Sequence, residues 1–258
     1  MSVILLLTIV VNAIYLVVPP ATGSQYSKDP IEFITGMFGF LGVLSIVSAT
    51  LFGADAIVSE FESKTGYFLF PNPIRKTTIF LGKFTASVLV SAGVIALYYL
   101  IAVVSVRVID GSVPARTGLS FAYSLVYLFA ILAVAYLFSA VMRSSVFALA
   151  LTFCTFLLIL PILDAVTAVA KFKAWFSITF ASGIITNILQ NPYPADRVIT
   201  NTLTTTTGGG KVATGSAGAL AVQVVRYYPT VTVSLAVLAA YFVAAFLLAA
   251  VLTQRREM

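Results

Sequence analysis

The sequence has 258 residues, of which 60% are hydrophobic and only 9% are charged, and its mean hydropathy is +1.05. An average soluble domain carries roughly 25% charged residues, so this composition excludes a soluble fold and indicates an integral membrane protein with several helices. The net charge of +6 does not indicate nucleic-acid binding, because the basic residues are scattered near the ends of apolar runs; we expect membrane lipids as partners and no nucleic acid.

Residue types that commonly perform chemistry are scarce. Histidine, the commonest general base and metal ligand, is absent, and the single cysteine, Cys154, lies inside an apolar run. We therefore expect no metal site, no intrachain disulfide and no catalytic residue in this chain. Cys154 itself is interpreted as a small buried or lipid-facing side chain.

Six apolar runs approach or exceed the about 20 residues that a helix needs to cross a bilayer. They cover residues 3–18, 31–54, 78–106, 119–142, 146–169 and 230–252. The first run is near the short limit and ends at Pro19-Pro20. No Lys or Arg precedes it, so we expect a retained span rather than the alternative, a cleaved signal peptide. The predicted fold is an all-α integral membrane protein with six transmembrane helices.

Small residues recur in the second run, with Gly36, Gly39 and Gly42 at every third position. Small side chains let two helix backbones approach closely. We interpret these glycines as helix packing within one subunit, and a subunit interface or a moving seam is the alternative.

The fifth run contains Asp164 near its far end. At this position a carboxylate can reach water, which favours an interfacial residue over the alternative of a proton site inside the membrane.

Residues 171–229 separate the last two runs and form a predicted extracellular loop. In its first part, Lys171 to Gln190, aromatic and aliphatic side chains recur every fourth residue, which predicts an amphipathic helix lying in the membrane interface. The residues assigned to this interfacial helix are Phe172, Trp175, Phe176 and Phe180. The Thr/Gly-rich stretch from Asn201 to Gly218 predicts a flexible or β-like loop.

Six spans would place both termini on one side of the membrane. The positive-inside rule assigns that side to the cytoplasm, because its short segments hold more basic residues than the opposite loops. These residues are Lys64, Arg75, Lys76, Arg143, Arg255 and Arg256, against Lys28, Arg107 and Arg116. We therefore expect a multi-pass protein of the cell membrane with cytoplasmic N- and C-termini.

A run of glycines followed by lysine, Gly208 to Lys211, superficially resembles a phosphate-binding loop. That motif needs a glycine at the position of Thr205 and a serine or threonine at the position of Val212, so we reject it. We expect no ATP-binding cofactor site in this chain.

The densest group of charges, prolines and glycines lies between the second and third runs, in residues 55–77 and the following Gly82-Lys83. Charges flanking a short apolar helix suit a reversible contact with a soluble partner, and prolines stiffen the corner that follows. A solvated loop whose charges only fix topology is the alternative.

This stretch resembles the cytoplasmic loop of type-2 ABC transporter permeases. The family shows an acidic pair, a Thr/Gly step, a Leu-x-x-Pro, a basic pair and a Gly-Lys that opens the third span. The matching residues are Glu60, Glu62, Thr65, Gly66, Pro73, Arg75, Lys76, Gly82 and Lys83. Unlike typical members, the chain has no long polar segment before its first apolar run, so we expect no cytoplasmic helix there.

The resemblance implies a single transmembrane permease domain over residues 1–258, working as an exporter. It implies two ABC ATPase subunits as partners, which would hold the ATP and Mg²⁺, and a second permease copy or related permease in a homo- or heterodimer. Residues expected to couple to the ATPase are Glu60, Phe61, Glu62, Lys64, Thr65, Gly66, Pro71, Pro73, Arg75 and Lys76, with Gly82 and Lys83 at membrane re-entry.

Two other functions stay open on the residues alone. The chain could be a membrane scaffold or assembly subunit that acts through its external loop. A secondary transporter is less favoured, since such a protein normally carries ionisable groups at mid-membrane.

Overall fold

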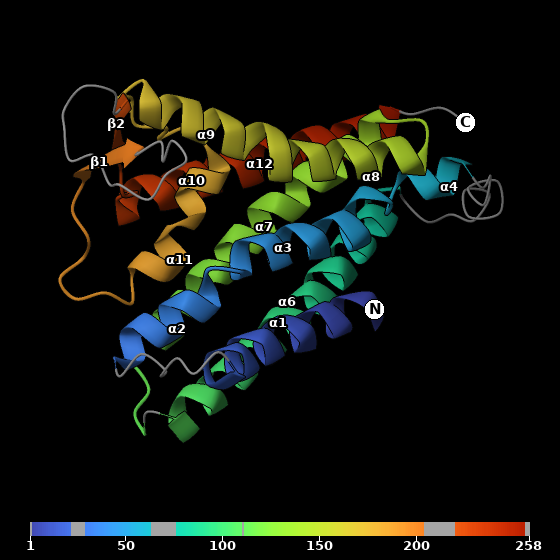
Figure 1. Ribbon diagram of the computed structural model, residues 1–258. Helices are drawn as coiled ribbons and strands as arrows, with labels where there is room; N and C mark the ends of the chain where they lie inside the picture. Colours follow the sequence, from blue (N-terminus) through green and yellow to red (C-terminus); the bar gives the residue numbers. More distant parts are fainter. Residues whose placement is uncertain (1, 22–28, 63–75, 110, 204–219, 256–258) are drawn as a thin grey trace, which may run out of the picture.

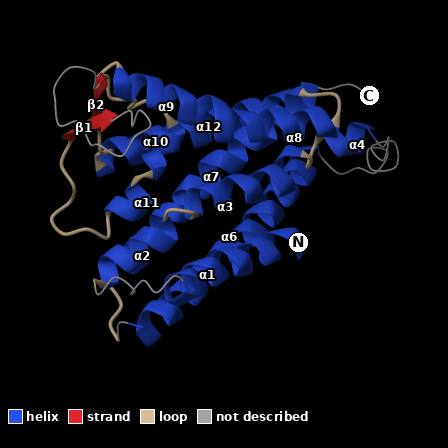
Figure 2. Ribbon diagram, in the orientation of Figure 1, coloured by secondary structure: helices blue, strands red, loops and turns tan. Residues whose placement is uncertain are grey.

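The computed structural model describes residues 2–21, 29–62, 76–109, 111–203 and 220–255, and helices dominate it (Figures 1 and 2). Long helical elements run side by side, with α1 and α6 on one side, α8 and α9 on the opposite side, and α3 and α7 between them. The first turn of α1, the last turn of α12 and the short helix α4 lie at the same end, called here the α4 end.

Five helical segments of the described chain are long and apolar enough to cross a membrane: Pro30–Glu60, Thr77–Ile109, Thr117–Val141, Ser145–Val169 and Val231–Arg255. They cover the second to sixth predicted runs, and they make this a multi-pass membrane protein. The first run forms α1 (Ser2–Ala21), whose apolar part, Leu6–Val17, is shorter. The six-span count therefore stays a prediction. The helix ends at Ala21, directly after the predicted end at Pro19-Pro20, because prolines offer no amide hydrogen to continue it.

The second run is not one continuous α-helix. It consists of α2 (Pro30–Phe38), α3 (Leu41–Ala49) and a π-helical turn, η1 (Thr50–Ala54). Asp29 starts α2 by accepting a hydrogen bond from the Ile31 amide at 3.0 Å, with Pro30 at the first helical position. At the break after α2, the Tyr98 hydroxyl of α6 (Lys76–Ile109) donates to the Met37 carbonyl at 2.6 Å.

The three glycines predicted to pack helices within the subunit do not share one close contact. A methyl group at Gly36 would meet Tyr15 of α1 at 3.7 Å, and one at Gly42 would meet Ser182 at 3.8 Å, which are ordinary contact distances. At Gly39 the nearest atom, 3.2 Å away, is the Gly36 carbonyl of the same segment. Gly36 and Gly42 therefore face different parts of the same chain, and Gly39 lies in the break of the second run.

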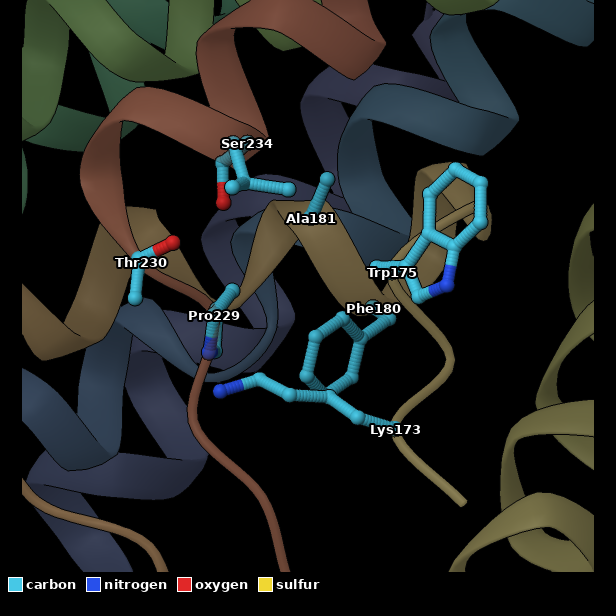
Figure 3. A pocket seen from close by; sticks show the side chains of 8 residues that line it. Lys173, Trp175, Phe180, Ala181, Pro229, Thr230 and Ser234 are labelled. Atoms are coloured by element: carbon cyan, nitrogen blue, oxygen red, sulfur yellow. The ribbon is translucent and has the colours of Figure 1, made fainter.

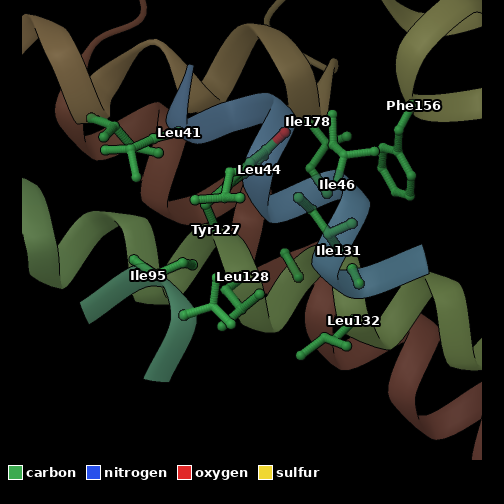
Figure 4. Close-up of a cluster of buried hydrophobic side chains, with 14 of the residues drawn as sticks. Leu41, Leu44, Ile46, Ile95, Tyr127, Leu128, Ile131, Leu132, Phe156 and Ile178 are labelled. Carbon is green, nitrogen blue, oxygen red and sulfur yellow. The ribbon is translucent and has the colours of Figure 1, made fainter. Parts of the chain in front are cut away.

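The core surrounds α7 (Thr117–Val141), which packs against α3, α6, α8, α11 and α12. Figure 4 shows buried side chains of this core from several segments, among them Leu44 of α3, Ile95 of α6 and Phe156. The buried positions of α7 include Tyr127, Leu128 and Ile131. A helix that is apolar all round is buried on most of its surface, which the sequence of α7 satisfies.

The fifth run forms α8 (Ser145–Cys154), a π-helical turn η2 (Thr155–Ile159) and α9 (Leu160–Val169). Pro161 lies in the first turn of α9 and lacks an amide hydrogen, so the helix must widen or bend just before it. Together with α12 (Val231–Arg255), this element exposes many large apolar side chains, such as Phe147, Ile162 and Leu247, as expected of surfaces that lipid or another membrane subunit covers.

The predicted amphipathic helix over residues 171–190 is correct only in part: residues 171–177 are not helical, whereas Phe180 lies in a short apolar helical stretch, Ile178–Asn187. Lys171 adopts a left-handed conformation with φ 58°, and the Phe172 amide donates back to the Thr167 carbonyl at 2.8 Å, so a Schellman motif ends α9 there. Phe172, Trp175 and Phe176 then lie in a non-helical turn. Two short helices follow, α10 (Ile178–Ser182) and α11 (Ile184–Asn187), and they pack against α7, α9 and α12.

Strands β1 (Arg197–Leu203) and β2 (Leu220–Arg226) pair antiparallel before α12, with Arg197 opposite Arg226. This hairpin modifies the all-α prediction. Residues 201–203 of the predicted Thr/Gly loop belong to β1, and its residues 204–218 lie outside the described residues.

Candidate functional site

The short helix α4 (Val58–Glu62) projects from the bundle at the end where α12 finishes (Figure 1). It carries the predicted acidic pair. Hydrogen bonds and an ion pair join it and the turn before it to three other helices, and we call this set of contacts the α4 clasp.

The first contact of the α4 clasp comes from Ser139 of α7. Its hydroxyl oxygen accepts hydrogen bonds from the backbone amides of Ile57 at 2.9 Å and Val58 at 3.0 Å. The first amides of a helix have no partner inside the helix, so a side chain from elsewhere stabilises them. Ser139 is fully buried, and it therefore fixes the start of α4 against the centre of the bundle.

Lys83 of α6 makes the second contact. Its Nζ lies 2.5 Å from Glu60 Oε1 and donates to the Ala56 carbonyl at 2.7 Å. The two ion-paired side chains are only 32% and 20% exposed, for Lys83 and Glu60 respectively, so water screens their attraction incompletely.

The third contact joins Glu62 to the start of α8. Glu62 Oε2 accepts a hydrogen bond from the Ser145 amide at 2.8 Å, and the Ser144 hydroxyl donates to Oε1 at 3.4 Å. A carboxylate at this position also complements the positive end of the helix dipole. The hydrogen bonds from Ser145 hold the pKa of the Glu62 carboxyl below its usual value near 4.5.

The π-helical turn η1 lies directly before the clasp, where α6 and α7 approach the chain closely. A methyl group on Gly53 would meet Ala135 Cβ at 3.0 Å and Leu132 Cδ2 at 3.1 Å, so glycine is needed for this approach. The Ser87 hydroxyl donates to the Phe52 carbonyl at 2.8 Å, and it lies 2.8 Å from the Tyr136 hydroxyl. These hydrogen bonds satisfy polar groups in a buried, widened turn.

The predicted site residues have different outcomes. Glu60, Glu62 and Lys83 come together in the α4 clasp, whereas Gly82 faces open space. Phe61 belongs to α4 and Lys76 begins α6, but their side chains are not described. The remaining predicted residues lie outside the described residues: Lys64, Thr65, Gly66, Pro71, Pro73 and Arg75.

Sequence reasoning missed Ser139, Ser87 and Gly53. The two serines lie within apolar runs, where a hydroxyl usually bonds to its own helix, so no local pattern distinguishes them. Gly53 continues the series of small residues in the second run and could have been considered with Gly42.

A second polar group lies toward the opposite end of the bundle. The Thr179 hydroxyl of α10 donates to Asp164 Oδ2 at 2.6 Å, while Oδ1 is buried and has no hydrogen-bond partner among the described residues. Asp164 therefore ties α9 to α10. Among the described residues, no three His, Cys, Asp or Glu side chains gather as potential metal ligands.

Comparison with known proteins gives one family. Residues 5–251 match the family described as ABC-2 family transporter protein, which is nearly the whole chain. No curated protein matches the sequence.

Proposed function

The chain belongs to the ABC-2 transporter family as a membrane subunit of an ABC transporter, and we propose that it couples ATP hydrolysis by a separate ATPase subunit to export of a substrate. ATP and Mg²⁺ would be bound by that partner. A second copy or a related chain would complete the membrane part.

The α4 clasp carries this proposal. A helix that contacts α6, α7 and α8 at the same time cannot be displaced without straining all three contacts. A force that the ATPase applies to α4 would therefore act on three membrane helices together. A loop that only links two spans needs no such contacts.

Energetics set the condition for this mechanism. ATP binding at the partner can shift the bundle only as far as it favours one arrangement over the other. The clasp would transmit a movement of the ATPase to the membrane helices, because α4 and the three helices that hold it would move as one unit.

The structure also changes the interpretation of the acidic pair. Glu60 and Glu62 both make contacts within the chain, so they position α4 besides any role at the partner. We therefore assign the direct ATPase contact first to Phe61 and to Lys64, Thr65 and Gly66, which follow α4 in the sequence.

Site-specific photo-crosslinking in native membranes tests the proposal. A photoreactive amino acid in place of Lys64 should capture an ATPase with cassette motifs, which mass spectrometry of the crosslinked species identifies. The same amino acid in place of Phe176, at the opposite end of the bundle, is the control and should capture none. If Lys64 crosslinks reproducibly only to proteins without cassette motifs, the proposal is wrong and an assembly role is favoured.

A further inference from the structure

A cavity of about 230 Å³ lies between the turn before α10 and the start of α12 (Figure 3). These two segments lie toward the end of the bundle opposite to α4 (Figure 1). We call it the α10–α12 cavity. Pockets that enclose a drug-sized ligand measure about 300–1,000 Å³, so this cavity holds only part of a molecule. Neither the clasp nor the proposed ATPase contact uses it.

One wall of the cavity is apolar and aromatic. Trp175 and Phe180 contribute rings from the α10 side (Figure 3). Val233 lines the cavity from α12. Trp175 is 56% exposed, and tryptophan is enriched at the interface between a bilayer and water. This wall suits the glycerol and upper chain region of a lipid better than a fully hydrated solute.

Lys173 supplies a positive charge at the cavity. Its Nζ lies 3.2 Å and 3.4 Å from the two Asp196 carboxylate oxygens, and Asp196 is itself fixed by the Tyr228 amide at 2.6 Å. An ammonium group has three N–H donors, so the pair with Asp196 leaves at least one for a ligand. The Lys173 side chain is 32% exposed, which leaves its ammonium accessible.

Ser234 adds an independent signal. Its side chain is only 2% exposed, and its hydroxyl has no hydrogen-bond partner among the described residues, although buried hydroxyls are normally paired. Figure 3 shows this oxygen on the side of Thr230 and Pro229, which line the same cavity. The first turn of α12 is also the positive end of that helix, and it favours an anion.

We propose that the α10–α12 cavity binds the phosphate head group of a phospholipid from the membrane leaflet at this end. Lys173 contacts the phosphate, Ser234 donates to one of its oxygens, and Trp175 and Phe180 pack against the glycerol region. The acyl chains then follow the exposed apolar surface of α12, where Val243 and Leu247 lie. This inference does not depend on the ATPase contact.

The chain contains a single tryptophan, Trp175, so its fluorescence reports on this cavity alone. The purified full chain in a maltoside detergent is titrated with dioctanoyl phosphatidylglycerol. Dioctanoylglycerol, which lacks the phosphate, and inorganic phosphate, which lacks the chains, are titrated in parallel. We expect saturable binding of the phospholipid only. Equal binding of dioctanoylglycerol, or saturation by inorganic phosphate alone, overturns the proposal, the latter in favour of a free-anion site.

Matched variants test the two polar groups. Lys173→Gln should weaken phospholipid binding about tenfold, which corresponds to one charge-assisted hydrogen bond, and Lys173→Arg should recover most of it. Lys171→Gln removes the same charge two residues away and should change the affinity less than about twofold.

Ser234→Ala should weaken binding about fivefold, the size of one neutral hydrogen bond. Ser91→Ala removes another buried hydroxyl without a partner in the described part of the chain, and because it lies outside the cavity it should leave the affinity unchanged. Lys173→Gln with wild-type affinity, in protein that elutes normally on size exclusion, refutes the assignment.

Discussion

The ion pair of the α4 clasp gives a prediction with a distinct quantitative signature. Lys83→Glu removes both the attraction to Glu60 and the hydrogen bond to Ala56, and it places two carboxylates together. Glu60→Lys removes the ion pair and adds repulsion between two ammonium groups, but it keeps the hydrogen bond from Lys83 to Ala56. The double variant with both changes restores an ion pair of reversed polarity. It cannot restore the bond to Ala56, because a carboxylate has no proton to donate.

The magnitudes follow from the geometry. A partly exposed ion pair contributes about 1 kcal/mol, and a hydrogen bond from a charged donor about 2 kcal/mol. With about 1 kcal/mol of added repulsion, Lys83→Glu should destabilise the docked state of α4 by about 4 kcal/mol. The double variant should cost about 2 kcal/mol, so roughly thirtyfold separates the two in the docking equilibrium.

Hydrogen–deuterium exchange of the amides from Ile57 to Glu62 measures this equilibrium, since local opening governs their exchange. Arg255→Glu, a charge reversal of an exposed residue at the same end, is the control and should leave exchange unchanged. Exchange in the double variant that equals that of Lys83→Glu, or wild-type exchange in all variants, would refute the clasp as described.

Two further predictions concern the surroundings of the clasp. Gly53→Ala should lower the melting temperature by about 2–6 °C, because Ala135 and Leu132 leave no room for the added methyl. Gly93 has open space around it, so Gly93→Ala is the control and should not lower the melting temperature. Equal shifts of the two variants in thermal unfolding would contradict this reasoning. The contact of Glu62 with Ser145 stabilises the fold fully when the pH is above the usual carboxyl pKa near 4.5. This stabilisation is lost as the pH falls through the lower pKa that Glu62 has in the folded protein. The ratio of exchange rates between Glu62→Gln and wild type in the first turn of α8 should therefore be constant above about pH 4.5 and approach one below it; a ratio that does not change with pH would show that Glu62 does not stabilise α8.

Long apolar runs were sufficient to predict the membrane class and the approximate extent of the spanning helices. Any segment of about 20 apolar residues must satisfy its backbone hydrogen bonds internally when it enters hydrocarbon, so the local sequence alone fixes a helix there. The same local reasoning identified the charged stretch after the second run as distinct, and the family resemblance that rested on it agrees with the match over residues 5–251.

Local patterns failed where the helix ends or distorts. Apolar side chains that recur every fourth residue after Lys171 predicted one amphipathic helix. Instead, the left-handed conformation of Lys171 ends α9 and starts a turn. Lysine has no intrinsic preference for that conformation, so the periodic pattern gave no warning of it. The π-helical turn η1 is similar, because a hydrogen bond from Ser87 of α6 stabilises it from outside its own sequence.

Only the tertiary structure decided what the acidic pair of α4 contacts. Glu62 meets Ser145 across 83 residues of sequence, and Ser139 meets Ile57 across 82. The composition of residues 55–77 fits a solvated loop and a docked helix equally well, since both need charge. A helix docks here only if the start of α6, the end of α7 and the start of α8 lie close enough to contact it. Helix packing in three dimensions determines these distances.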